Sequence, residues 1–150
     1  MIKSAFFLFL SVLIATSLVI LQETMSNLIW LSSVNMPVTF SIFIATYIDN
    51  LFMMNGGGEV PLILLVAIGM CFAFLVSKIL LNWVEISKSF AYGLAGSAAI
   101  LAIVLLMPLA FYNLDILAGG RSIAGKTILS LYGFISGYFF GASLSSKVES

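Results

Sequence analysis

Long apolar runs dominate the sequence, and four of them have the length of a membrane-spanning helix. They lie near residues 5–21, 60–81, 90–112 and 123–144. A helix needs about 20 consecutive apolar residues to cross the hydrocarbon core of a bilayer. A spanning segment must also satisfy its own backbone hydrogen bonds, which favours helix over strand. The pattern therefore predicts an all-α, integral membrane bundle of four transmembrane helices that form a single domain.

Residues 36–48 form a shorter apolar segment, with Pro37 near its start and Asp49 and Asn50 after its end. Runs of about 10–14 apolar residues are typical of interfacial or re-entrant segments rather than full crossings. We expect an additional short interfacial or re-entrant segment here. A fifth span is the alternative.

The distribution of cations favours four spans over five. With four spans, four of the six cations lie on or near the N-terminal side of the membrane and two lie on the other side; a fifth span would make the split three to three. Cytoplasmic segments of membrane proteins carry an excess of Lys and Arg. We therefore expect both termini in the cytoplasm and a location in a bacterial cytoplasmic (inner) membrane. The larger group is Lys3, Lys78, Lys88 and Lys147, and the smaller is Arg121 and Lys126.

The N-terminal run could alternatively belong to a signal peptide, because residues 15–17 resemble a small-x-small cleavage site. The apolar run continues through residues 18–21, past that site. We therefore expect a retained span.

Composition excludes several classes of function. Of 150 residues, 62% are hydrophobic and 8% are charged, and the mean hydropathy is +1.21, so a soluble domain is not expected. Six cations balance six anions, which leaves no basic field for nucleic acid. The chain has no His and a single Cys, so we expect no metal site, no cofactor and no Ser-His-Asp catalysis. A Ser-Lys pair is not excluded.

Residues 119–127 read GGRSIAGKT, and positions 120–127 match the phosphate-binding P-loop pattern. A working P-loop joins a buried strand to a helix and needs an acidic residue on a later strand for Mg²⁺. Here the motif lies between two apolar spans, so we expect no nucleotide binding. Arg121 and Lys126 are instead candidates for contact with a lipid phosphate.

Glu23 and Asp49 are the candidate residues for a polar site. Glu23 lies two residues past the first apolar run, among several other polar residues. Ionisable residues within spans are functional candidates, although Glu23 and Lys78 are both close enough to an interface to reach water. Nothing in the sequence itself brings the two carboxylates together.

The strongest pattern is a row of glycines in the last span. Gly133, Gly137 and Gly141 follow at intervals of four residues, so they share one helix face. Rows of small residues let membrane helices approach closely. The third span offers a matching row, for which we expect intramolecular packing, with a homo-oligomer or a dock for another subunit as the alternative. That row is Ala91, Ala95 and Ala99.

These patterns predict a non-catalytic small polytopic membrane protein, an accessory or assembly subunit that acts through helix packing. Its expected partners are the lipid bilayer and other membrane subunits or further copies of itself. The alternative is a small transporter or channel that uses a polar site near Glu23 and Asp49. A weaker alternative is a lipid-handling enzyme that uses the loop of Arg121 and Lys126.

Overall fold

A computed structural model describes residues 2–56, 60–110 and 117–145, and every regular element in these ranges is a helix. This confirms the expected all-helical class. Within these ranges, four helices are long and apolar enough to cross a membrane, as the hydropathy pattern predicts. In chain order the elements are α1 (Ile2–Ser33), α2 (Phe40–Gly56), α3 (Leu62–Leu80), α4 (Lys88–Ala110), the 3₁₀-helix η1 (Ala118–Arg121) and α5 (Ile123–Ser145).

Helix α1 is much longer than the apolar run at 5–21 and ends only at Ser33. The residues beyond that run are more polar, but none of them is Gly or Pro, so nothing interrupts the helical backbone. The helix stops where Asn35 adopts a left-handed conformation, with φ of 61°. Asn35 and the residue after it donate their N–H groups to carbonyls in the last turn of α1, at 3.1 Å each, as in a Schellman motif.

The segment expected at 36–48 is a later and longer helix, α2. It begins after Pro37, at a turn capped by Thr39, whose hydroxyl accepts the backbone N–H three residues on, at 3.4 Å. Asp49 and Asn50 do not end the helix as expected, because Asp and Asn cost at most about 0.7 kcal/mol relative to Ala within a helix. No residue of α2 is fully buried.

The other long helices begin at residues suited to a helix start. Pro61 precedes α3, and Asn55 of α2 accepts a first-turn N–H of α3 at 2.9 Å. Ser87 and Ser122 precede α4 and α5, and their hydroxyl oxygens accept first-turn N–H groups at 3.4 and 2.9 Å. These caps satisfy backbone donors that have no partner inside the helix.

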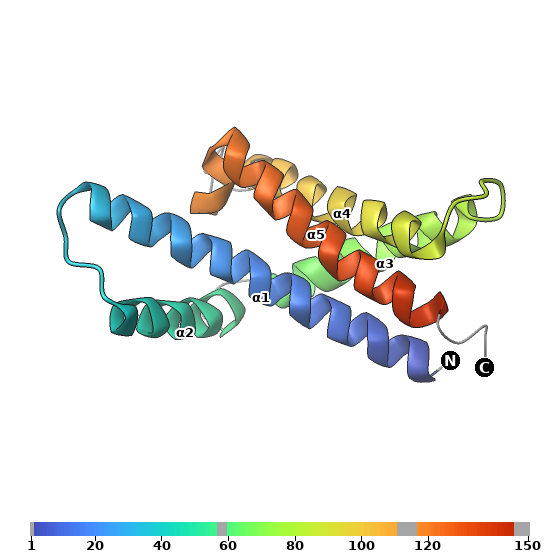
Figure 1. The fold of residues 1–150 in the computed structure, drawn as a ribbon, viewed down its shortest axis with the longest axis horizontal. Helices are drawn as coiled ribbons and strands as arrows, with labels where there is room; N and C mark the ends of the chain where they lie inside the picture. The colour runs from blue at the N-terminus through green and yellow to red at the C-terminus, as the bar shows by residue number, and fades with distance from the viewer. Residues whose placement is uncertain (1, 57–59, 111–116, 146–150) are drawn as a thin grey trace.

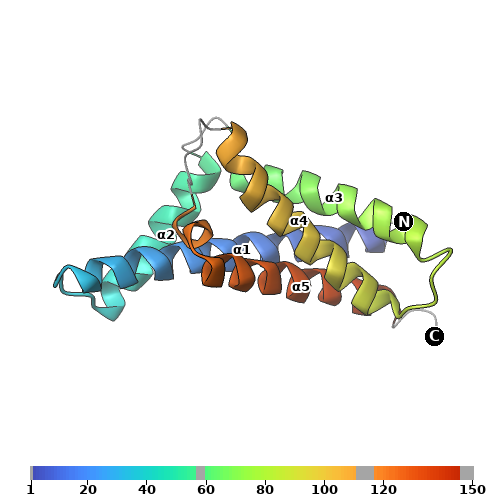
Figure 2. The ribbon, with the colours of Figure 1, turned by 90° about the horizontal axis from the view of Figure 1, so that it is seen from above.

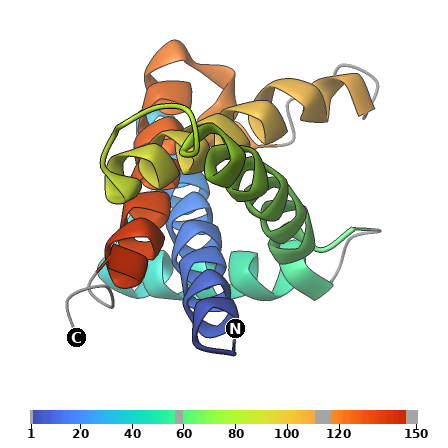
Figure 3. The ribbon, with the colours of Figure 1, turned by 90° about the vertical axis from the view of Figure 1, so that its right-hand side faces the viewer.

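The four long helices alternate in direction, so the start of α1 and the end of α5 lie at the same end of the molecule (Figure 1). Around the bundle the order is α1, α5, α4, α3, and each helix packs on its two neighbours. The view along the bundle in Figure 3 shows the same ring. The most extensive contact is between α4 and α5.

Aromatic side chains join three helices in the core. Phe74 of α3 stacks on Phe140 of α5 with ring centroids 4.7 Å apart, and Tyr92 of α4 meets both rings edge-on, at 5.3 and 5.1 Å. Each ring is at least 94% buried. Such pairs stabilise a core beyond their area burial. The cluster continues along the bundle through Val12, Val19, Ile20, Val66, Met70, Ile100, Val104 and Leu129.

The C-terminal part of α1 and the crossing helix α2 extend beyond the ends of α4 and α5 (Figures 1 and 2). This part of the molecule exposes large apolar side chains. Trp30 of α1 is 64% exposed, and Phe40 and Phe52 of α2 are 78% and 69% exposed. The outer face of α2 is thus mostly apolar, with Asp49 as a charged residue on it, the opposite of what water contact favours.

Candidate functional site

Glu23 is an acidic side chain that the fold buries, with 8% of its surface exposed. Its carboxylate accepts two hydrogen bonds, both at 3.3 Å. Oε2 accepts the Gly119 N–H of η1, and Oε1 accepts from Nδ2 of Asn27, one turn later in α1. Glu23 therefore connects α1 to the segment that enters α5.

Asp49, the other candidate for a polar site, lies exposed on the outer face of α2. Its neighbour Asn50 faces inward instead and donates from Nδ2 to Oγ1 of Thr24, at 3.0 Å. The Thr24 hydroxyl donates in turn to the Ile20 carbonyl at 2.9 Å. The fold thus places the amide of Asn50, rather than the Asp49 carboxylate, against α1, and it does not bring Glu23 and Asp49 together.

A second hydrogen bond between α1 and α2 joins Ser17 and Tyr47, whose hydroxyl oxygens are 2.6 Å apart. Sequence reasoning missed this pair and the pair of Asn50 with Thr24. The available signal is the spacing of Tyr47 and Asn50, three residues apart on a mostly apolar helix, which places both on one face. The partners on α1 could not be found in this way, because they depend on the angle at which α2 crosses α1.

The GGRSIAGKT stretch forms η1, a bend at Ser122 and the first turn of α5. The backbone N–H groups of its three glycines have partners within the protein. Gly125 donates to Oγ of Ser122 at 2.9 Å, Gly119 donates to Glu23, and Gly120 donates to a preceding carbonyl at 2.9 Å. Gly125 also packs directly on the Gly119 carbonyl, where a side chain would not fit. A phosphate cradle requires such N–H groups to point at the ligand.

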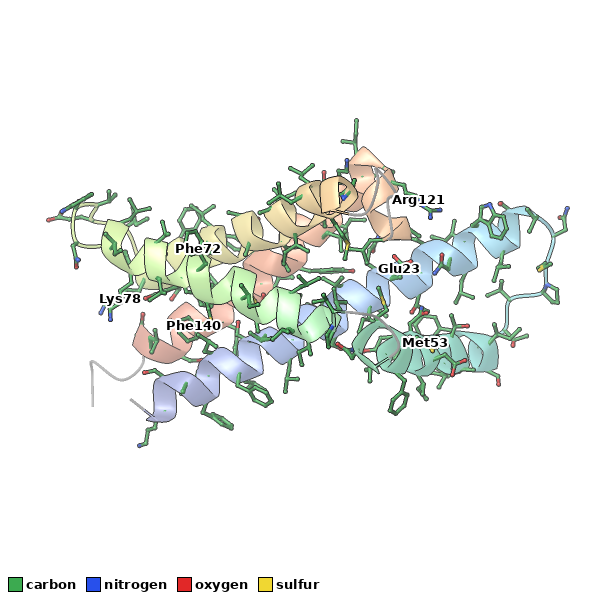
Figure 4. The ribbon with its side chains drawn as sticks, turned by 180° about the vertical axis from the view of Figure 1, so that it is seen from behind. Glu23, Met53, Phe72, Lys78, Arg121 and Phe140 are labelled. Atoms are coloured by element: carbon green, nitrogen blue, oxygen red, sulfur yellow. The ribbon has the colours of Figure 1, made fainter. Side chains whose placement is uncertain are left out.

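Arg121 lies exposed in η1, and Lys126 lies half-buried in the first turn of α5. Figure 4 places Arg121 and Glu23 at the same end of the molecule, with Lys78 at the opposite end. The two candidates for lipid-phosphate contact therefore sit where a bilayer around the four long helices would present its headgroups.

The glycine row of α5 lies against the backbone of α4. Gly133, Gly137 and Gly141 are all buried. An added Cβ at Gly133 or Gly137 would collide with a carbonyl oxygen of α4, and at Gly141 it would come within 2.6 Å of the Ser89 Cα. Gly96 of α4 approaches Gly133 in the same way. A row of bare backbone on each helix therefore forms this contact.

The alanine row of α4 occupies a different face of the helix from this contact. The α4 residues nearest to the glycine row of α5 include Ser89, Tyr92, Gly93 and Gly96, and the row of Ala91, Ala95 and Ala99 is not among them. The alanines turn towards α3, where the Cβ of Ala99 lies 3.9 Å from the position of an added Cβ at Gly69. The close approach of the glycine row to α4 is the expected one, but it uses Gly93, which lies beside the alanine row, and Gly96 rather than the alanines themselves. The helix has small residues on two faces, and sequence periodicity could not tell which face α5 would take.

An apolar groove of about 760 Å³ lies between α3 and α4 on the outside of the bundle. Figure 3 shows the two helices leaving their connecting loop in different directions. Its lining combines small residues, which we call the floor, with large apolar side chains such as Phe72, Val76, Leu94 and Leu106, which we call the walls. None of the residues that line it is charged. The floor residues are Gly69 and Ala73 of α3, and Ala91, Ala95, Ala98 and Ala102 of α4.

Among the described residues, no group of three or more His, Cys, Asp or Glu side chains is placed to hold a metal ion. Cys71 is half-buried in α3. No protein-family model matches the chain, and no curated protein or solved structure shows significant similarity to it.

Proposed function

We propose that the protein is a non-catalytic integral membrane subunit that works by packing its helices against another membrane component. The proposal starts from the four long apolar helices and the lipid-like exposure of their outer faces. Phe6 and Phe9 of α1, Phe72 of α3 and Ile135 of α5 are all more than 50% exposed. Lipid is the solvent that favours such faces.

Because the four helices alternate in direction, a membrane around them would have the start of α1 and the end of α5 on the same side. The loop between α3 and α4, with Lys88, lies at that same end. Because Lys and Arg concentrate on the cytoplasmic side, we assign this end to the cytoplasm of a bacterial cell. Helix α2 then lies at the opposite surface as an interfacial helix, with its apolar outer face against lipid.

The observation that carries the proposal is the groove between α3 and α4. In lipid, apolar surface alone does not bring helices together, so association depends on close packing and on interhelical hydrogen bonds. A floor of Gly and Ala allows a partner backbone to approach closely. The contact of α4 with α5 shows the same chemistry used inside this molecule. The groove offers a second such face that no helix among the described residues fills.

The alternative, a small transporter or channel at Glu23 and Asp49, has less support. The Glu23 carboxylate already holds the entry to α5 in place, and Asp49 faces outward on α2. A solute site needs several groups that converge on one cavity. The observed hydrogen bonds instead run between helices and fix their positions.

The proposal is tested by placing a photo-crosslinking amino acid at Ala98, on the floor of the groove, in membranes of the source cell. The matched control carries it at Ala124, an exposed alanine of α5 outside the groove. We expect a discrete crosslinked band from position 98 only, and we expect Ala95→Leu to abolish it. Equal labelling of lipid from both positions, with no band, would reject the packing function.

A further inference from the structure

The length of the groove distinguishes between its possible occupants. Its lining runs from Leu65 of α3 to Leu81, the residue after that helix, and from Ala91 to Met107 on α4. At 1.5 Å per residue each side is about 24 Å long. The hydrocarbon core is about 30 Å thick, so one lipid chain from either leaflet would end about halfway along the groove. A transmembrane helix would follow it from end to end.

The shape of the floor points to the same occupant. Ala98 and Ala102 are exposed, and Ala95 is half-buried between the larger side chains of the walls. A flexible lipid chain gains little from such a floor, because it can also fill the uneven surface of large side chains. A helix gains more, because a small-residue floor lets its backbone come within van der Waals contact over several turns.

Lys88 sets the charge at one end of the groove. It is the first residue of α4 and precedes Ala91 and Ala95 by three and seven residues, so it shares their helix face. Side chains point towards the start of their helix, so Lys88 extends to the membrane surface. Lys3 and Lys78 lie at the same end of the bundle, and Glu85 is the acidic residue there among the described ones. This end therefore favours an anionic group.

We infer that the groove receives a single transmembrane helix of another subunit, and that this helix carries a carboxylate where it leaves the bilayer beside Lys88. The inference rests on the proposed function and adds the chemistry of the partner. The carboxylate fixes which way the partner helix runs, because reversing the helix would remove it from Lys88. The apolar lining requires the rest of the partner segment to be free of charge.

The inference can be tested with the purified protein in phosphatidylcholine vesicles. The probes are three synthetic Leu-Ala helices of about 20 residues, identical except for Glu, Gln or Lys at one end. Energy transfer is measured from a donor at Ser4→Cys, in a Cys71→Ala background, to an acceptor on the peptide. We expect the Glu peptide to bind roughly two- to fivefold more tightly than the Lys peptide, as an exposed ion pair allows. In Lys88→Glu this preference should reverse.

Ala98→Leu should abolish binding of all three peptides, and Ala124→Leu should not. Equal affinities of the Glu and Lys peptides would overturn the inference that the partner carries a carboxylate but leave the packing function intact. Two results would overturn the helix as occupant. In the first, no peptide binds, but mass spectra show phosphatidylglycerol retained by the wild type and lost in Ala98→Leu. The other is self-association of the protein that is lost in Ala98→Leu, which would identify the occupant as a second copy.

Discussion

Gly137 of α5 lies directly against the backbone carbonyl of Tyr92 in α4. A Cβ atom added at Gly137 would collide with that oxygen and come within 3.2 Å of the Gly93 Cα. The two backbones therefore meet with no side-chain layer between them. At this distance the dispersion contacts of many atoms add up, which is the main source of helix association in lipid.

Gly137→Leu should destabilise the protein strongly, because backbone rather than a flexible side chain opposes the new atoms. Overpacking of this kind typically costs about 1–3 kcal/mol. Thermal unfolding in detergent measures the change. The matched control is Gly56→Leu, since a Cβ there would meet nothing within 4 Å. Similar losses in the two variants would show that the α4–α5 contact has no special role.

Glu23→Leu should lower the unfolding temperature, because it leaves the buried N–H of Gly119 without an acceptor. An unsatisfied buried polar group costs about 1–3 kcal/mol. Glu23→Gln keeps one acceptor oxygen and should retain most of the stability. Asp49→Asn, on the exposed side of α2, should change little. If amide exchange at Gly119 is no faster in Glu23→Leu than in the wild type, the assigned hydrogen bond is wrong.

The P-loop-like motif should not bind ATP or GTP, because the N–H groups of Gly119, Gly120 and Gly125 already have partners. Calorimetry on the purified protein tests this expectation. Saturable binding that disappears in Lys126→Ala would contradict it, since a true P-loop lysine contacts the phosphates. Ser122→Ala should instead affect stability, by about 0.5–2 kcal/mol, through the lost helix cap.

Single cysteines that replace Ser4 and Ser87 should be labelled from one side of the membrane in intact cells. Those that replace Ser41 and Ser122 should be labelled from the other side. The four helices alternate in direction, so these two pairs lie at opposite ends of the bundle. The measurement uses a Cys71→Ala background and a reagent that does not cross membranes. Labelling of Ser4 and Ser41 from the same side would contradict the proposed orientation of α1 as a complete span.

Long apolar runs in the sequence located the four long helices, because hydropathy over about 20 residues is a strong signal. The apolar runs were less accurate in predicting where each helix ends. The apolar run of α1 stops at residue 21, yet the helix continues to Ser33, because helix formation and membrane crossing obey different rules. Residues 22–33 contain no Gly or Pro to disfavour helix, so the backbone continues without regard to hydropathy, whereas crossing needs apolar side chains throughout.

The contact between α4 and α5 was harder to predict from the sequence than the helices themselves. The glycine row of α5 was visible from its spacing, but its partner face on α4 was not. Ala91, Ala95 and Ala99 repeat every four residues, and so do Ser89, Gly93 and Ser97 on the face that meets α5, so spacing alone does not choose between the two faces. Which face meets α5 depends on the rotation of α4 in the bundle, and contacts distant in sequence set that rotation. The hydrogen bond between Ser97 and Ser130 is one of them.

The two small-residue faces of α4 have a consequence for biogenesis. The chain is made from its N-terminus, so α4 reaches the membrane before α5 is complete. When α5 arrives, either face of α4 could accept its glycine row. Ser97 lies beside the glycine face and forms a hydrogen bond with Ser130. Its Oγ atom is 2.9 Å from the carbonyl oxygen of Ser130 and 2.6 Å from the Ser130 hydroxyl oxygen. The alanine face offers no such hydroxyl, so mispairing would leave Ser130 without this partner, and that difference favours the observed pairing.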